Sequence, residues 1–194
     1  MIKVMTKPMA AQLSESDKGQ EIISSIAMIV ALVSFAMLFA TLMMGFAMFR
    51  FTSPVWPPAG MEKPSLILPS LSTLSIFLSS LCFMHFEKNI KNKQGLVLTI
   101  ALGCGFMLTQ SLLWQQLKSQ GIFVSSGIFP SIIYAFTWIH AAHIVVALGL
   151  LIWLLVNVLK QISPRSQIRV SNVGKFWHFL GIVWFIMFLT IFVL

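Results

Sequence analysis

The chain has 194 residues, of which 58% are hydrophobic and 9% are charged, and its formal net charge is +8. Soluble globular domains contain about 25% charged residues, so this composition excludes an ordinary soluble domain. The polar segments are also too short to form a second, water-soluble domain with a core of its own. The composition indicates one integral membrane domain.

Five apolar segments are each long enough to cross a bilayer, which takes about 20 helical residues. They cover residues 22–49, 65–86, 95–117, 129–159 and 174–194. A polar tail, residues 1–21, precedes them; it lacks the apolar stretch and cleavage site of a signal peptide, so we expect none to be removed. The sequence predicts an all-α integral membrane protein in which residues 22–194 form a bundle of five transmembrane helices.

The cations lie mainly on one side of these segments. Ten lie on the side of the N-terminus: Lys3, Lys7, Lys18, Lys88, Lys91, Lys93, Lys160, Arg165, Arg169 and Lys175. Three lie on the other side: Arg50, Lys63 and Lys118. The positive-inside rule then predicts a cytoplasmic N-terminus and an outer C-terminus. Because anionic lipid headgroups account for the basic surface, we expect no nucleic-acid partner.

The predicted spans contain few ionisable or reactive side chains. All five acidic residues lie in the tail, in loops or at span ends, and no Lys or Arg lies at a span centre. A proton-coupled transporter needs intramembrane ionisable groups and often internal repeats, so this class is disfavoured. The two cysteines, Cys82 and Cys104, lie on different spans at different depths, as packing residues do. We predict no catalytic residue.

Histidines are the remaining polar groups of interest inside the spans. His140 and His143 share a helix face, and His178 lies near the start of the fifth span. A bis-histidine haem needs histidines of different helices at matched depth, which His143 and His178 allow. A proton relay is a second interpretation. Hydrogen bonding between helices is the third and is favoured, because polar groups in lipid need partners.

Three motifs, in order along the chain, carry a resemblance to a known family. They are "WPPAG" with Trp56, Pro57, Pro58 and Gly60; "TWIHAAHIVVALG" with His140, His143 and Gly149; and "FWHFLGIVW" with Trp177, His178, Phe179, Val183 and Trp184. Together they resemble subunit III of the haem-copper terminal oxidases, the cytochrome c and quinol oxidase family, over about residues 22–194. The resemblance is to the short, five-helix form of that subunit.

The resemblance implies a non-catalytic core subunit of a respiratory oxygen reductase in the bacterial inner membrane. Such a subunit packs on the catalytic subunit, holds lipid, and supports assembly and sustained proton-coupled reduction of oxygen. Oxidase subunits I and II are the implied partners, with phospholipids and, as further candidates, a fourth subunit or a larger supercomplex. No metal or cofactor is expected in this chain; haem and copper are expected in the partners. The alternatives are an accessory subunit of a nitric oxide reductase and a stand-alone b-type cytochrome.

The resemblance also assigns candidate roles to single residues. Candidates for helix interfaces are His140, His143, His178, Trp177 and Trp184, and candidates for lipid contact are His85, Arg50 and Lys175. Three positions depart from the family, because Phe35, Leu113 and Gly181 stand where carboxylates are usual. Compared with the long form, two helices are absent, so we expect lipid or helices of another chain to cover the exposed face.

Overall fold

A computed structural model describes residues 15–54, 65–160 and 164–193 of the chain. The helices in these ranges are α1 (Glu15–Thr52), α2 (Ile67–Lys88), α3 (Gln94–Ser119), α4 (Ile128–Lys160) and α5 (Pro164–Phe188). A short 3₁₀ turn, η2 (Val124–Ser126), precedes α4, and a π-helical turn, η3 (Leu189–Val193), continues α5. All five long helices are long and apolar enough to cross a membrane. The prediction of an all-α fold with five such helices is confirmed.

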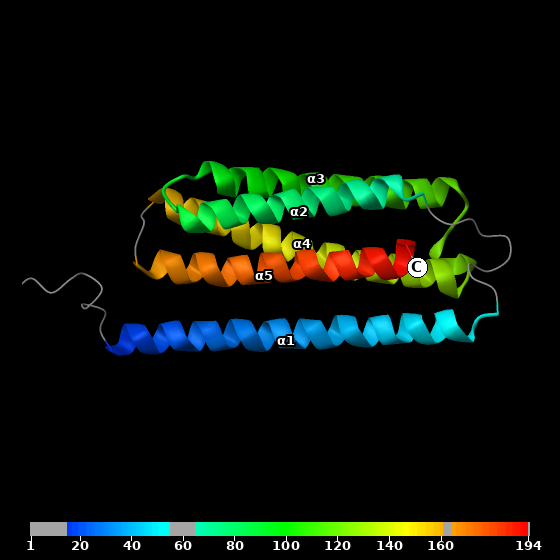
Figure 1. Cartoon of the computed structure of the whole chain (residues 1–194), viewed down its shortest axis with the longest axis horizontal. Helices are drawn as coiled ribbons and strands as arrows, with labels where there is room; N and C mark the ends of the chain where they lie inside the picture. Colours follow the sequence, from blue (N-terminus) through cyan, green and yellow to red (C-terminus); the bar gives the residue numbers. More distant parts are fainter. Residues whose placement is uncertain (1–14, 55–64, 161–163, 194) are drawn as a thin grey trace, which may run out of the picture.

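The helices run side by side along one axis, and α1 lies at one edge of the bundle, next to α5 (Figure 1). Of the most apolar stretch of α1, 6% is buried within the chain, compared with 44% for α5. The described chain starts and ends at opposite ends of the bundle, as an odd number of spans requires. Helix α5 is therefore the central element, and α1 is the peripheral one.

The closest packing in the bundle is between α2 and α3, which a short connection joins as a helical hairpin. A Cβ atom added to Gly95 would lie 2.9 Å from a backbone carbonyl oxygen of α2. The hydroxyl of Ser79 donates to the carbonyl of Thr99 at 3.0 Å, and that of Ser75 donates to the carbonyl of Leu102 at 2.8 Å. Small and hydroxylated residues let membrane helices approach closely and supply hydrogen bonds, which explains the tight hairpin.

The connection between α3 and α4 is fixed by glycine and by one tyrosine. Gly121 has a φ of 74° directly after α3, a backbone conformation that residues with a Cβ rarely adopt. The hydroxyl of Tyr134, on α4, donates to the carbonyl oxygen of Ile122 at 3.0 Å. This bond attaches the connection to the first turns of α4.

Helix α5 begins at Pro164, ten residues before the span expected from residue 174. The stretch Gln167–Val193 is apolar enough overall to count as a candidate span, even though it includes Arg169 and Lys175. Helix α1 likewise extends beyond its expected span at both ends. The apolar pattern marks the part of a helix that lies in hydrocarbon, whereas backbone hydrogen bonding continues into polar flanks.

Candidate functional site

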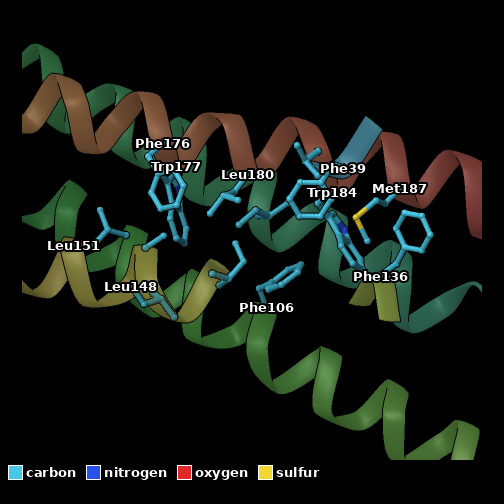
Figure 2. Packing of buried hydrophobic residues seen from close by; sticks show 14 of the residues in the cluster. Phe39, Phe106, Phe136, Leu148, Leu151, Phe176, Trp177, Leu180, Trp184 and Met187 are labelled. Atoms are coloured by element: carbon cyan, nitrogen blue, oxygen red, sulfur yellow. The ribbon is translucent and has the colours of Figure 1, made fainter. Parts of the chain in front are cut away.

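His140 lies at a junction of four helices. Its side chain, on α4, is 0% exposed. Its ring centroid is 6.0 Å from that of Phe39 on α1, 5.8 Å from that of Phe106 on α3 and 5.4 Å from that of Trp184 on α5. The rings of these three residues lie within one buried cluster (Figure 2). Helices α1, α3 and α5 therefore each contribute one aromatic ring to the surroundings of His140.

The histidine packs through its ring and not through hydrogen bonds. Neither ring nitrogen of His140 has a hydrogen-bond partner among the described residues. The ring planes of Phe39 and Phe106 make angles of 65° and 73° with the imidazole, which are edge-to-face arrangements. The interhelical hydrogen bonds that we expected for His140 are thus replaced by aromatic contacts.

His143 lies one helical turn along α4 and faces α1. Its ring centroid is 4.6 Å from that of Phe35, in an edge-to-face contact, and 5.5 Å from that of Phe39. Its Nδ1 atom forms a hydrogen bond of 2.7 Å with the carbonyl oxygen of Ile139 in the same helix. Phe35, one of the three positions that depart from the carboxylates usual in the resembled family, is therefore a packing residue that holds α1 against α4.

His178 belongs to a different part of the bundle. On α5, its ring centroid is 5.8 Å from that of Phe83 on α2, again edge to face. The described ranges contain no group of three or more His, Cys, Asp or Glu placed to hold a metal ion. The structure brings His140 and His143 together on the α1 side of α4, and it places His178 between α5 and α2.

Trp177 and Trp184 join α5 to the α2–α3 hairpin. Both side chains are 0% exposed and point into the core (Figure 2). A Cβ atom at Gly103 would lie 2.8 Å from the Trp177 ring, so this glycine makes room for the indole. The Nε1 atom of Trp184 donates to the hydroxyl of Thr73 on α2 at 3.0 Å. Gly103 therefore has a packing role in the structure.

A buried hydrogen-bond cluster between α2 and α3 was missed by the sequence reasoning. The side-chain nitrogen of Gln110 donates to the Ser72 hydroxyl at 3.0 Å, and the hydroxyls of Ser72 and Thr109 are 2.7 Å apart. Gln110 is 1% exposed. The signal was present in the spacing of Ser72, Ser75 and Ser79, which places three serines along one side of a helix.

Residues 17–194 match the family described as cytochrome c oxidase subunit III. The chain belongs to this family. It is 27% identical, over 178 residues, to a protein of Synechocystis sp. named cytochrome c oxidase subunit 3; the alignment covers 86% of this chain and 73% of that protein. A protein of the same name from Thermostichus vulcanus is 23% identical over 175 residues, which are 86% of this chain and 85% of that protein.

Longer members of the family are matched over part of their length. The cytochrome c oxidase subunit 3 of Yarrowia lipolytica is 29% identical over 147 residues, which are 70% of this chain and 53% of that protein. The chain thus spans about half the length of that relative. Together with the five apolar helices, membership of the family identifies a multi-pass membrane protein related to oxidase subunits.

The other family positions are spread over the molecule. The loop motif with Trp56, Pro57, Pro58 and Gly60 lies outside the described residues. Lys175 and His85 are exposed, and Arg50 is half-buried. Arg50 lies in the last turn of α1 and His85 in the last turn of α2, and these two helices run in opposite directions (Figure 1). The three candidate lipid-contact residues therefore do not form one site.

Proposed function

We propose that this chain is the non-catalytic subunit III of a respiratory haem-copper oxygen reductase. The observation that carries the proposal is the match of residues 17–194 to the cytochrome c oxidase subunit III family. The content of the interior supports it, because the space around His140 is filled by aromatic rings from three other helices. In this proposal the haem and copper belong to oxidase subunits I and II, and this chain acts by packing and by retaining lipid.

The burial of the helices supports a role in a larger assembly. Only 6% of the most apolar stretch of helix α1 is buried within the chain, and Ile29, Val33, Met37 and Met44 are exposed. Apolar surface of this kind is stable in contact with lipid or with helices of other subunits. We infer that subunit I, phospholipid or both cover this side of α1. A fourth oxidase subunit or a respiratory supercomplex would add further contacts.

The charge pattern supports a position in the bacterial cytoplasmic membrane with the N-terminus inside. Ten of the 13 cations lie on the side of the chain that includes the α2–α3 connection, and three lie on the other side. Basic residues are retained on the cytoplasmic side of membrane proteins and attract its anionic lipids.

The test is purification of the complex through an affinity tag on this chain. We expect a haem-copper catalytic subunit and a copper-binding subunit to co-purify, with oxygen-consuming activity. Deleting the gene should reduce the amount or the sustained turnover of the oxidase without changing its visible spectrum per catalytic subunit. Recovery of this chain alone with a Soret band of its own would instead identify a b-type cytochrome. Recovery with a nitric oxide-reducing subunit would identify the other alternative.

A further inference from the structure

A series of side-chain contacts connects α3, α2, α5 and α4 in turn. The amide nitrogen of Gln110 joins α3 to α2 through its hydrogen bond to the Ser72 hydroxyl at 3.0 Å. The next residue of α2, Thr73, accepts a hydrogen bond from Trp184 on α5. The Trp184 ring in turn lies 5.4 Å, between centroids, from the ring of His140 on α4. Gln110 and His140 are therefore linked through two intervening helices.

The contacts between α3 and α4 link the same two residues from the other side. The ring centroid of Phe106 is 5.8 Å from that of His140, and the Nε1 atom of Trp114 donates to the hydroxyl of Thr137 at 3.0 Å. Phe106, Gln110 and Trp114 are spaced by four residues and share one face of α3. Gln110 therefore lies on the face of α3 that meets α4, between the contacts with Thr137 and His140.

Gln110 and His140 both have polar atoms without a partner in the protein. Their side chains are 1% and 0% exposed. The side-chain oxygen of Gln110 and both ring nitrogens of His140 make no hydrogen bond to any described residue. Buried polar groups are nearly always hydrogen-bonded, because an unpaired group loses its hydration and gains nothing in return. The two side chains therefore need a partner that the surrounding helices do not supply.

The rings around His140 cannot be that partner. Phe39 and Phe106 have no polar side-chain atom, and the single donor of Trp184 already bonds to α2. The partner must also meet a mixed requirement, since the oxygen of Gln110 is an acceptor, whereas a neutral imidazole has one donor and one acceptor. A cation could not accept from the imidazole, and an anion could not donate to the amide oxygen. A water molecule donates and accepts, so it can serve both side chains.

We propose that one internal water molecule bridges the side-chain oxygen of Gln110 and a ring nitrogen of His140. The water donates to the amide oxygen, and the tautomer of the imidazole decides whether the ring donates to the water or accepts from it. Buried waters typically bond in this way to polar groups that the protein leaves unpaired. The interhelical hydrogen bond expected for His140 then runs through water and joins α4 to α3. The inference is independent of the proposed function, because it concerns the interior of this chain alone.

The test is a map of the complex purified through this chain, at a resolution that shows ordered waters. We expect a peak at about 2.7–3.2 Å from both the Gln110 oxygen and one ring nitrogen of His140. The variant Gln110→Met keeps an unbranched side chain but has no amide oxygen, so the peak should be lost. The matched control is Gln115→Met, at an exposed position of the same helix, which should leave the peak in place.

A second measurement detects the water without a map. X-ray radiolysis converts bound water into hydroxyl radicals, which oxidise the side chains beside it even when these are buried. Phe106 and Phe86 are both 0% exposed, and Phe106 is the one that contacts His140. We expect Phe106 to be oxidised more than Phe86 in the intact complex, and Gln110→Met should lower its oxidation to the level of Phe86.

Three results would overturn the proposal: a map without a peak between the two side chains, a Gln110 oxygen bonded directly to protein, or equal oxidation of Phe106 and Phe86. If Gln110→Met prevents assembly, the wild-type map and the wild-type oxidation of the two phenylalanines decide the question. A complex that contains other partners than a haem-copper subunit would refute the proposed function and leave this test unchanged.

Discussion

The indole nitrogen of Trp184 donates a hydrogen bond to the hydroxyl of Thr73 at 3.0 Å, across 111 residues of sequence. Thr73 in turn donates to the carbonyl oxygen of Pro69 within α2, so its position is fixed from both sides. The bond lies beside an apolar groove between α2 and α5, and it orients the indole that packs against His140. One hydrogen bond thus connects the groove to the buried junction.

Replacing Trp184 by phenylalanine should destabilise the protein through the loss of this bond. The lost bond should cost about 0.6–2 kcal/mol, the range for hydrogen bonds between membrane helices, and the volume that the smaller phenyl ring leaves unfilled adds to this cost. The check is the thermal unfolding midpoint of the purified complex, with the exposed Trp138→Phe as control. Trp184→Phe and Thr73→Val should be non-additive in a double-mutant cycle. Additive effects would show that the bond contributes nothing.

Truncating His140 should weaken assembly without removing haem. His140→Ala leaves an unfilled space among four helices, and truncations of large core residues cost about 2–5 kcal/mol. His140→Leu keeps more of the volume and should cost less. The combined variant with His143→Leu should lower the yield of assembled oxidase further, because His143 also contacts α1.

The measurement for these histidine variants is the amount of assembled complex together with its ratio of haem to catalytic subunit. The matched control is His85→Ala, because His85 is exposed. An unchanged ratio is expected in every variant. A loss of haem from complexes that remain intact would make the histidines ligands and would refute the packing role.

Adding a methyl group to Gly95 should separate the α2–α3 hairpin. An added Cβ lies 2.9 Å from a backbone carbonyl oxygen of α2, and backbone moves less readily than the end of a side chain. Gly95→Ala should therefore destabilise the protein by about 1–3 kcal/mol, the usual cost of overpacking. Gly149→Ala, where no atom lies within 4 Å of the added group, should be neutral or stabilising. Similar unfolding midpoints for the two variants would contradict this account.

Reporter fusions at Lys91 and Lys118 should lie on opposite sides of the membrane. Lys91 lies in the α2–α3 connection and Lys118 lies near the end of α3, so a helix that spans the bilayer separates them. The excess of cations on the side of Lys91 predicts that this side is cytoplasmic. A cytoplasmic reporter should be active at Lys91 and inactive at Lys118. Equal activity at both positions would exclude the proposed topology.

A carbodiimide should leave the membrane-spanning parts of the helices unlabelled. The reagent modifies protonated carboxyl groups in membranes, and Phe35, Leu113 and Gly181 stand where the family usually has carboxylates. The measurement is peptide mass spectrometry after treatment of the intact complex. The variant Phe35→Glu provides the positive control, because it places a carboxyl group beside His143. Modification of a native residue within a span would contradict the prediction.

The helices were predictable from sequence because hydrocarbon thickness sets a length and a composition that short loops do not meet. The five apolar segments therefore correspond to α1–α5, although the ends differ where polar residues such as Arg169 continue a helix. The sequence does not predict as well which helix faces pack together, since a helix that is apolar on all sides has no distinct face to bury. The pairing of Trp184 with Thr73 depends on how α5 is rotated against α2, which one sequence does not reveal.

The candidate site residues show the same difference between what the sequence predicts and what it does not. The burial of His140 was predictable, because a polar ring within a membrane span almost always faces the interior of the helix bundle. Its partners were not: a polar ring suggested hydrogen bonds, whereas Phe39, Phe106 and Trp184 surround it. The cluster around Gln110 was missed because serines in an apolar helix also bond to their own backbone, as Ser72 does with Leu68, and so predict no particular neighbour.

The peripheral position of α1 has a consequence for the life of the protein before assembly. Its contacts with the buried core come from one side of the helix, through Met28, Leu32, Phe35, Phe39, Leu42, Met43 and Phe46. Since 6% of its most apolar stretch is buried, compared with 28–44% for the other helices, less free energy opposes its thermal separation. A copy without its partner subunits would open at α1 most often, which exposes the histidine junction to lipid. Membrane-bound proteases would then remove unassembled copies faster than assembled ones. The loosely held helix would keep the amount of this subunit in step with the amount of the complex it joins.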